Sequence, residues 1–153
     1  LKMGYKNIKV ANAEEFDLDA TFDCIVAGEL IEHLSNPGLF FERCRAHLRA
    51  GGRLVVSTPY AFSLLYFLYA LLKYPNTCQN DEHTFWFCPK TLAELATRYG
   101  FRSVSWELSE DYEFDNSSKL YLLFARFITT IGRILIPGRL RKNTMIFVFE
   151  LDQ

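Results

Sequence analysis

The sequence predicts an α/β fold, because short apolar strands alternate with helices along its 153 residues. The clearest unit lies between residues 22 and 58, where a strand, a helix and a second strand follow one another with short links. Such a unit predicts parallel pairing and a right-handed crossover. Half of the residues are hydrophobic, which is enough to build the core of a single domain spanning residues 1–153.

The predicted strands of the first half have different apolar patterns. Residues 8–13 are predicted as a short strand. Residues 22–28 (FDCIVAG) form an apolar run typical of a strand that is covered on both faces, and residues 53–58 (RLVVST) form the next strand.

A helix is predicted between the last two of these strands. Asn36 is a good N-cap and Pro37 fits the first helical position. An apolar face is formed by Phe40, Cys44 and Leu48, at i, i+4 and i+8. Gly51 and Gly52 are expected to end the helix.

The second half continues the alternation. A helix is predicted from Pro89 to residue 99, with Gly100 stopping it and an inner face of Leu92, Leu95 and Ala96. Residues 103–108 and 144–151 alternate as strands do.

Charge and cysteine content restrict the class of protein. Seventeen basic residues against eighteen acidic ones leave a net charge near zero, so no nucleic-acid partner is expected. The four cysteines form no CxxC pair. Cys24 and Cys44 fall on predicted core faces, which indicates buried, reduced thiols and a cytoplasmic location.

Two apolar segments, residues 61–74 and 120–136, are too short to span a bilayer. The second lies within a basic amphipathic segment, residues 119–142. Its polar stripe consists of Arg126, Thr129, Thr130 and Arg133. A helix of this kind either lies at a membrane surface, which would make the protein peripheral to the membrane, or packs on the domain with its stripe in water.

The turn after residues 22–28 carries Glu29, Glu32 and His33, a spacing that puts all three on one side of a helical turn. Ligands bind beyond the carboxyl ends of strands in open α/β sheets, where this turn is expected. Three interpretations of this turn are possible. In the first, the three residues hold a metal such as Mg²⁺. In the second, His33 serves as a general base or substrate contact, and in the third, the turn is purely structural.

Three segments follow one another in a characteristic order: FDCIVAGELIEHL, NPGLFFERCRAHLRAGGRLVVSTPY and the Pro-led helix ending in GF. In this order the chain resembles the class I S-adenosylmethionine-dependent methyltransferases over residues 8–108. The resemblance implies a Rossmann-like fold of three α/β/α layers, with a mostly parallel sheet and an antiparallel C-terminal strand. It also implies methyl transfer from S-adenosylmethionine, with O-methylation of a small molecule, a sugar or a lipid-linked acceptor as the expected reaction.

The same resemblance assigns roles to particular residues. Residues 8–13 match the family's third sheet strand, whose end contacts the adenine through Asn12 and Ala13, with Asn12 standing where the family has an acid. Ala27, Gly28 and Glu29 would pass close to the cofactor.

At this turn the chain resembles two metal-assisted branches, the ubiquinone-biosynthesis O-methyltransferases and the small-RNA 2′-O-methyltransferases. They imply a metal site of Glu29, Glu32, His33 and His83. In the metal-free alternative, His33 and Glu32 are the expected catalytic residues.

Residues 61–88 are expected to form a substrate-side insertion. Within it, residues 80–92 (NDEHTFWFCPKTL) resemble the substrate loop of methyltransferases of surface-polysaccharide or lipid-linked sugar pathways. The acceptor would be contacted by His83, Phe85 and Trp86. Alternatively, Phe85 and Trp86 simply cover the sheet edge.

No G-x-G motif occurs in the sequence, although the family holds its cofactor with one. The chain is therefore expected to be the C-terminal two-thirds of a methyltransferase domain, without the first strands, and to bind the cofactor weakly or not at all by itself. The alternative is a non-catalytic remnant that acts as a peripheral membrane or protein-interaction module. A sheet edge left open by missing strands would favour a homodimer.

Overall fold

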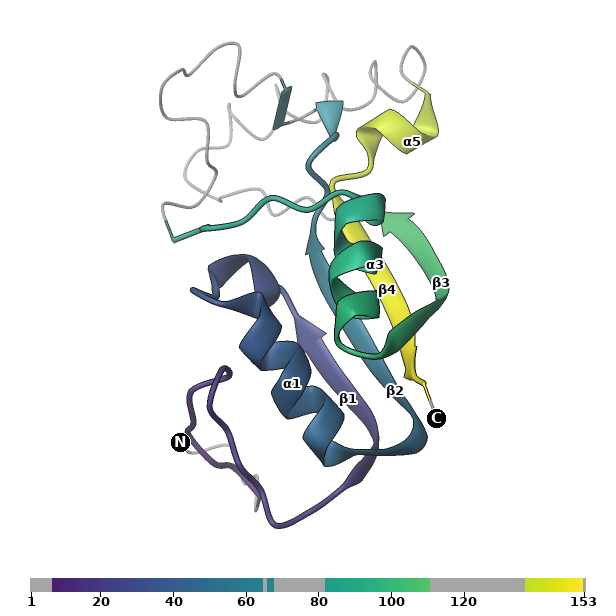
Figure 1. Ribbon diagram of the computed structural model, residues 1–153. Helices are drawn as coiled ribbons and strands as arrows, with labels where there is room; N and C mark the ends of the chain where they lie inside the picture. Colours follow the sequence, from purple (N-terminus) through teal and green to yellow (C-terminus); the bar gives the residue numbers. More distant parts are fainter. Residues whose placement is uncertain (1–6, 65, 68–81, 111–136, 153) are drawn as a thin grey trace.

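The computed structural model describes residues 7–64, 66–67, 82–110 and 137–152 (Figure 1). Within them four strands form one sheet in the order β1-β2-β4-β3. The strands are β1 (Phe22–Gly28), β2 (Leu48–Pro59), β3 (Phe101–Ser109) and β4 (Thr144–Leu151). The helices are η1 (Ile31–His33, a single 3-10 turn), α1 (Pro37–His47), α3 (Pro89–Arg98) and α5 (Gly138–Arg141).

The pairing of the strands confirms the predicted βαβ unit. Strands β1 and β2 are parallel, with Ala27 opposite Val56 and Gly28 opposite Ser57, and α1 connects them. Strand β4 runs antiparallel to both β2 and β3, so the predicted antiparallel C-terminal strand is confirmed. The carboxyl ends of β1 and β2 therefore meet at one edge of the sheet (Figure 1).

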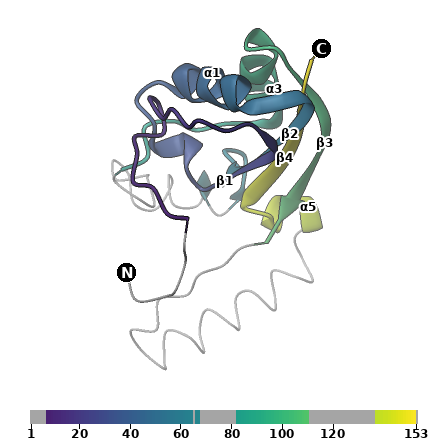
Figure 2. The same cartoon turned by 90° about the horizontal axis from the view of Figure 1, so that it is seen from below.

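The helices α1 and α3 cover the same face of the sheet (Figure 2). That face is fully buried at alternate positions of the two central strands, as period-two side-chain alternation requires. The core residues there are Leu54, Val56, Met145, Phe147 and Phe149. The described residues thus contain two of the three layers that the resemblance implies.

Helix α1 begins as predicted and ends earlier than predicted. The Asn36 side chain accepts a hydrogen bond from the Gly38 backbone N–H at 3.1 Å, and Pro37 occupies the first turn. The expected end at Gly51 and Gly52 is wrong. The backbone becomes extended at Leu48, which already pairs with Phe22 of β1, so both glycines lie inside β2.

Two further predictions of the sequence are corrected. Residues 8–13 form no strand, because they have no partner strand in the described part of the chain to complete a hydrogen-bond ladder. Strand β1 is not covered on both faces. It lies at the edge of the sheet, where Ala27 is buried but Val26 is 71% exposed.

The cysteines of the described residues differ in burial. Cys44 is buried as predicted, whereas Cys24 is exposed on the edge strand, so its predicted place in the core is wrong. Burial raises the pKa of the Cys44 thiol to about 12, because a thiolate would lose its hydration there. At the start of α3, the hydrogen bond from the Thr91 hydroxyl lowers the pKa of Cys88.

We expect iodoacetamide at pH 8 to alkylate Cys88 in the folded protein and to leave Cys44 unmodified, because only the thiolate reacts. Peptide mass spectrometry over a time course measures both sites, and a Cys88→Ser variant identifies the Cys88 peptide. Modification of Cys44 at the rate of Cys88 in the folded protein would contradict the assigned burial.

The two predicted apolar segments lie mainly outside the described residues. Of residues 61–74 the structure describes 61–64 and 66–67, and of the basic amphipathic segment 119–142 it describes 137–142. No helix in the described part of the chain is long and apolar enough to cross a membrane.

Candidate functional site

The turn after β1 places the acidic residues at the carboxyl edge of the sheet. Glu29 adopts a left-handed backbone with φ of 47°, a conformation that non-glycine residues seldom adopt. Its backbone N–H donates to the Ser57 carbonyl at 3.0 Å and contacts the Ser57 hydroxyl oxygen at 3.1 Å. This anchor to β2 fixes the direction in which the chain enters η1.

Glu32 is a buried carboxylate, with 1% of its surface exposed. The hydroxyl of Thr58, at the end of β2, donates to Glu32 Oε2 at 2.9 Å. The other oxygen, Oε1, is buried and accepts no hydrogen bond from the described residues. A buried carboxylate oxygen without a donor is costly, so a site that retains one is a candidate for function.

The backbone of Glu32 brings a distant segment into the site. Its carbonyl accepts hydrogen bonds from the N–H groups of Thr84 at 2.8 Å and Phe85 at 3.1 Å. The Thr84 hydroxyl also donates to the Glu32 carbonyl at 3.0 Å and contacts the Leu34 carbonyl at 2.7 Å. These bonds place His83 directly against η1.

His33 and His83 meet edge to face, with ring centroids 4.6 Å apart. His33 Nε2 lies 3.9 Å from Glu32 Oε1. His83 Nδ1 is buried and has no hydrogen-bond partner among the described residues. Burial lowers the pKa of His83 and the neighbouring His33 lowers it further, which outweighs the opposite effect of Glu32 and Glu82.

Glu32, His33 and His83 form the cluster on which the site is built. One donor atom from each residue lies within 4.8 Å of the others. Glu29, which the sequence grouped with them, lies outside this set. Glu32 Oε1 and His83 Nδ1, which make no hydrogen bond with the described residues, are available to a proton, a substrate or an ion. Two imidazoles and one carboxylate fit a transition metal better than Mg²⁺, which prefers oxygen ligands.

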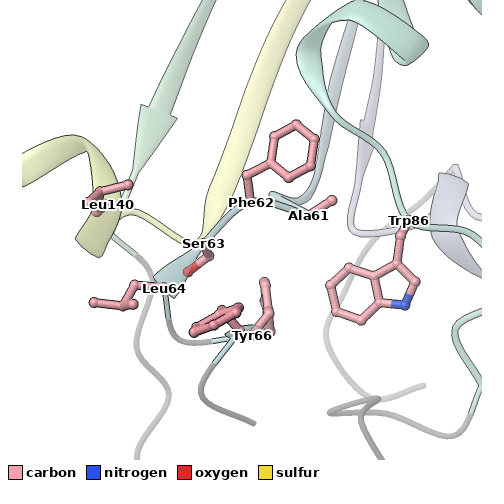
Figure 3. A pocket seen from close by; sticks show the side chains of 8 residues that line it. Ala61, Phe62, Ser63, Leu64, Tyr66, Trp86 and Leu140 are labelled. Carbon is pink, nitrogen blue, oxygen red and sulfur yellow. The ribbon is translucent and has the colours of Figure 1, made fainter. Parts of the chain in front are cut away.

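An apolar pocket of about 510 Å³ lies beyond the ends of β2 and β4 (Figure 3). Its lining residues are Ala61, Phe62, Ser63, Leu64, Tyr66, Phe67, Trp86 and Leu140. Trp86 joins this pocket to the cluster, because its ring centroid lies 4.7 Å from that of Tyr66 and 6.0 Å from that of His83. Phe85 instead stacks on Phe87, with centroids 5.9 Å apart.

A second cavity, of about 620 Å³, lies against β1. Of the residues expected to contact a cofactor, Ala13 and Ala27 line it. Asn12, Gly28 and Glu29 are not part of its lining. Asn12 Oδ1 accepts a hydrogen bond from the Glu14 N–H at 3.0 Å, which closes a turn just before Ala13.

Two threonines that organise the cluster, Thr58 and Thr84, are not among the residues that the sequence predicts for the site. Thr58 carried a signal, since it is a polar residue in the buried register of a central strand. Thr84 carried none, because its role depends on the docking of residues 84–85 against η1.

Comparison with known proteins gives a family and a fold. A family model described as a methyltransferase domain matches residues 3–105. A ubiquinone biosynthesis O-methyltransferase of Nitrobacter winogradskyi is 40% identical over 50 residues, which cover 33% of this chain and 19% of that protein. One of Bradyrhizobium sp. is 47% identical over 45 residues, which cover 29% of this chain and 18% of that protein. The matched segments thus span about a fifth of these relatives' length.

Solved structures share the fold at low sequence identity. A SAM-dependent methyltransferase from Archaeoglobus fulgidus superposes with a TM-score of 0.61 at 18% identity, over 94% of this chain and 67% of that one. Phosphoethanolamine N-methyltransferase 2 of Haemonchus contortus was solved in complex with S-adenosyl-L-methionine. It superposes with a TM-score of 0.58 at 15% identity, over 93% of this chain and 36% of that one.

Proposed function

Since the chain belongs to the methyltransferase domain family, we propose that it catalyses methyl transfer from S-adenosylmethionine to a hydroxyl oxygen of an apolar acceptor. The observation that carries this proposal is the Glu32–His33–His83 cluster, which lies beside an apolar pocket at the carboxyl edge of the sheet. The distant relatives named as O-methyltransferases support oxygen as the atom that is methylated.

The cavity against β1 is the proposed cofactor site. Its volume of about 620 Å³ suits a nucleoside-sized ligand, and Ala13, Phe16, Ala27 and Leu30 give it apolar walls for a flat ring. Asn12 is not part of the lining, but it lies in the chain between Ala11 and Ala13, which are, and its side chain offers an amide donor and a second carbonyl lone pair to an adenine edge. Gly28 and Glu29 follow Ala27 toward the cluster. When bound, S-adenosylmethionine supplies a methyl group on a positively charged sulfur.

The cluster removes the proton that the acceptor hydroxyl must lose. An imidazole titrates near neutral pH and is a suitable general base, which makes His33 the proposed base. Glu32 Oε1, 3.9 Å from His33 Nε2, stabilises the imidazolium that forms. His83 lies against the His33 ring and helps to orient it. Glu32 and His33 are therefore the proposed catalytic residues.

The apolar pocket favours an acceptor with an uncharged, apolar body, either aromatic or lipid-like, over a free sugar. Trp86 would guide that body toward His83, and Phe85 lies next to it in the chain. A phenolic hydroxyl, with an ordinary pKa of about 10, gives up its proton to an imidazole far more readily than an aliphatic alcohol does. We therefore choose 4-octylphenol as the probe acceptor.

A second candidate is metal-assisted transfer, which is favoured by the two donor atoms that make no hydrogen bond with the described residues. Glu32, His33 and His83 would hold a divalent ion such as Mn²⁺ or Zn²⁺. A bound ion would polarise the acceptor hydroxyl and ease its deprotonation.

The test measures S-adenosylhomocysteine formed from S-adenosylmethionine with 4-octylphenol, before and after treatment with EDTA. We expect EDTA to leave the rate unchanged and His33→Ala to lower it by about 100-fold or more, the usual contribution of a general base. The exposed neighbour Glu82 provides a matched control, because Glu82→Gln should leave the rate unchanged.

The metal candidate would be favoured over the general base if EDTA abolished activity and Mn²⁺ restored it, and if the His83→Ala variant had no activity even with Mn²⁺. Full activity in both His33→Ala and His83→Ala would show that the cluster is not the reaction centre.

A further inference from the structure

One wall of the cavity against β1 is a segment with no regular secondary structure. Ala13, Phe16 and Leu18 belong to this wall, yet residues 12–18 form neither a helix nor a strand. Ordering such a segment costs about 1–2 kcal/mol per residue in backbone entropy. Specific contacts must therefore hold it in place. Lys9 Nζ donates to the Asp17 carbonyl at 2.8 Å, and two side-chain contacts, one at each end of α1, connect the segment to that helix.

The first contact lies at the start of α1. Glu14 Oε1 accepts hydrogen bonds from the backbone N–H groups of Ser35, at 2.6 Å, and Asn36, at 3.0 Å. Asn36 is the residue that caps α1. The carboxylate thus lies at the positive end of the helix dipole, where a negative charge is stabilised.

The second contact lies at the end of α1. His47 is buried, with 3% of its surface exposed, and both of its ring nitrogens are used. The Leu18 backbone N–H donates to His47 Nε2 at 2.8 Å, and His47 Nδ1 contacts the Arg43 carbonyl at 2.7 Å. The exposed carboxylate of Asp17 also lies 3.3 Å from His47 Nε2, so this nitrogen contacts two groups of the segment. The Phe16 ring packs on the imidazole, with centroids 4.9 Å apart.

We propose that Glu14 and His47 are positioning residues for cofactor binding. Together they clamp residues 14–18 along α1, and this clamp fixes Ala13, Phe16 and Leu18 as a rigid wall of the cavity. The inference rests on the proposed function, because it takes this cavity as the cofactor site. Neither residue touches the Glu32–His33–His83 cluster, so the clamp acts on binding and leaves the proton-transfer step unchanged.

The test uses the variants Glu14→Ala and His47→Leu, with Glu94→Ala on α3 as the control. Among the described residues Glu94 makes an exposed i,i+4 ion pair with Arg98 and no other side-chain contact, so its loss should change little. We expect each clamp variant to raise the Kd for S-adenosylhomocysteine and the KM for S-adenosylmethionine by about tenfold, with kcat within about twofold. Amide hydrogen exchange should become faster at residues 14–18.

His47→Gln provides the conservative rescue, because its side-chain carbonyl can accept from Leu18 as Nε2 does. We expect it to restore most of the affinity that His47→Leu loses. Unchanged affinity in both clamp variants, with binding by the unaltered protein intact, would overturn the clamp alone. If the unaltered protein binds no S-adenosylhomocysteine while residues 14–18 remain protected from exchange, the proposed cofactor site fails, and the clamp's role in binding fails with it.

Discussion

Replacing Glu32 with glutamine is expected to lower turnover by about 100-fold or more while the folded protein stays as stable as before or becomes more stable. Glutamine keeps the shape of the side chain and can still accept from the Thr58 hydroxyl. It removes the negative charge that stabilises a protonated His33. It also removes a buried charge whose Oε1 has no hydrogen-bond donor in the described part of the chain.

Two measurements on the same variant check this prediction. The first is kcat with 4-octylphenol at saturating S-adenosylmethionine, and the second is the midpoint of thermal unfolding. A purely structural Glu32 would give the opposite pattern, a lower unfolding midpoint with turnover reduced only in proportion to the folded fraction. Glu82→Gln again controls for the loss of a nearby carboxylate.

Replacing Phe41 with alanine is expected to cost about 3–5 kcal/mol in the free energy of unfolding, the usual result for a fully buried aromatic ring. Phe41 is completely buried. It connects three elements, because its ring lies 6.1 Å from Tyr99 after α3, 5.7 Å from Phe101 of β3 and 6.1 Å from Phe149 of β4. Alanine would leave a cavity where α1, α3 and the sheet meet.

Urea unfolding monitored by circular dichroism measures this cost. Domains of this size have total stabilities of about 5–15 kcal/mol, so Phe41→Ala is expected to be near the limit of folding. Phe41→Leu keeps most of the volume and should cost less than about 1.5 kcal/mol. A cost below about 1 kcal/mol for Phe41→Ala would show that α1 does not pack on the sheet as described.

Local sequence signals predicted the elements that local chemistry determines. The cap at Asn36, the proline that follows it and the buried Phe40 and Cys44 of α1 all lie where the pattern placed them, whereas Leu48 belongs to β2. Gly100, with φ of 82°, follows α3 as a helix-stopping glycine should. These signals act within a few residues of one another, so the sequence alone reveals them.

Errors arose where a contact with a distant segment decides the structure. The pairing of Leu48 with Phe22 ends α1 before the glycines that were expected to end it. The apolar run of β1 predicted full burial, but burial depends on what lies beside the strand, and β1 is at the edge of the described sheet. The strand predicted at residues 8–13 likewise requires a partner.

In the candidate site, too, local sequence signals predicted some features, whereas contacts with distant segments decide the others. The pattern of Glu32 and His33 predicted the turn. Helical spacing also grouped Glu29 with them, whereas η1 begins only at Ile31 and Glu29 lies outside the cluster of Glu32, His33 and His83. His83 was assigned by family resemblance, and the hydrogen bonds of Thr84 place it beside His33. The contacts of Glu14 and His47 with segments 21 to 29 residues away leave no trace in local spacing.

The central claim is that the Glu32–His33–His83 cluster is the reaction centre of a methyltransferase. A crystal structure of the protein with S-adenosylhomocysteine, grown in the presence of Mn²⁺, tests it most directly. The account predicts the adenosine in the cavity lined by Ala13 and Ala27, with the sulfur directed toward His33. A sulfur directed away from the cluster, or a ligand bound on another face of the sheet, would contradict it.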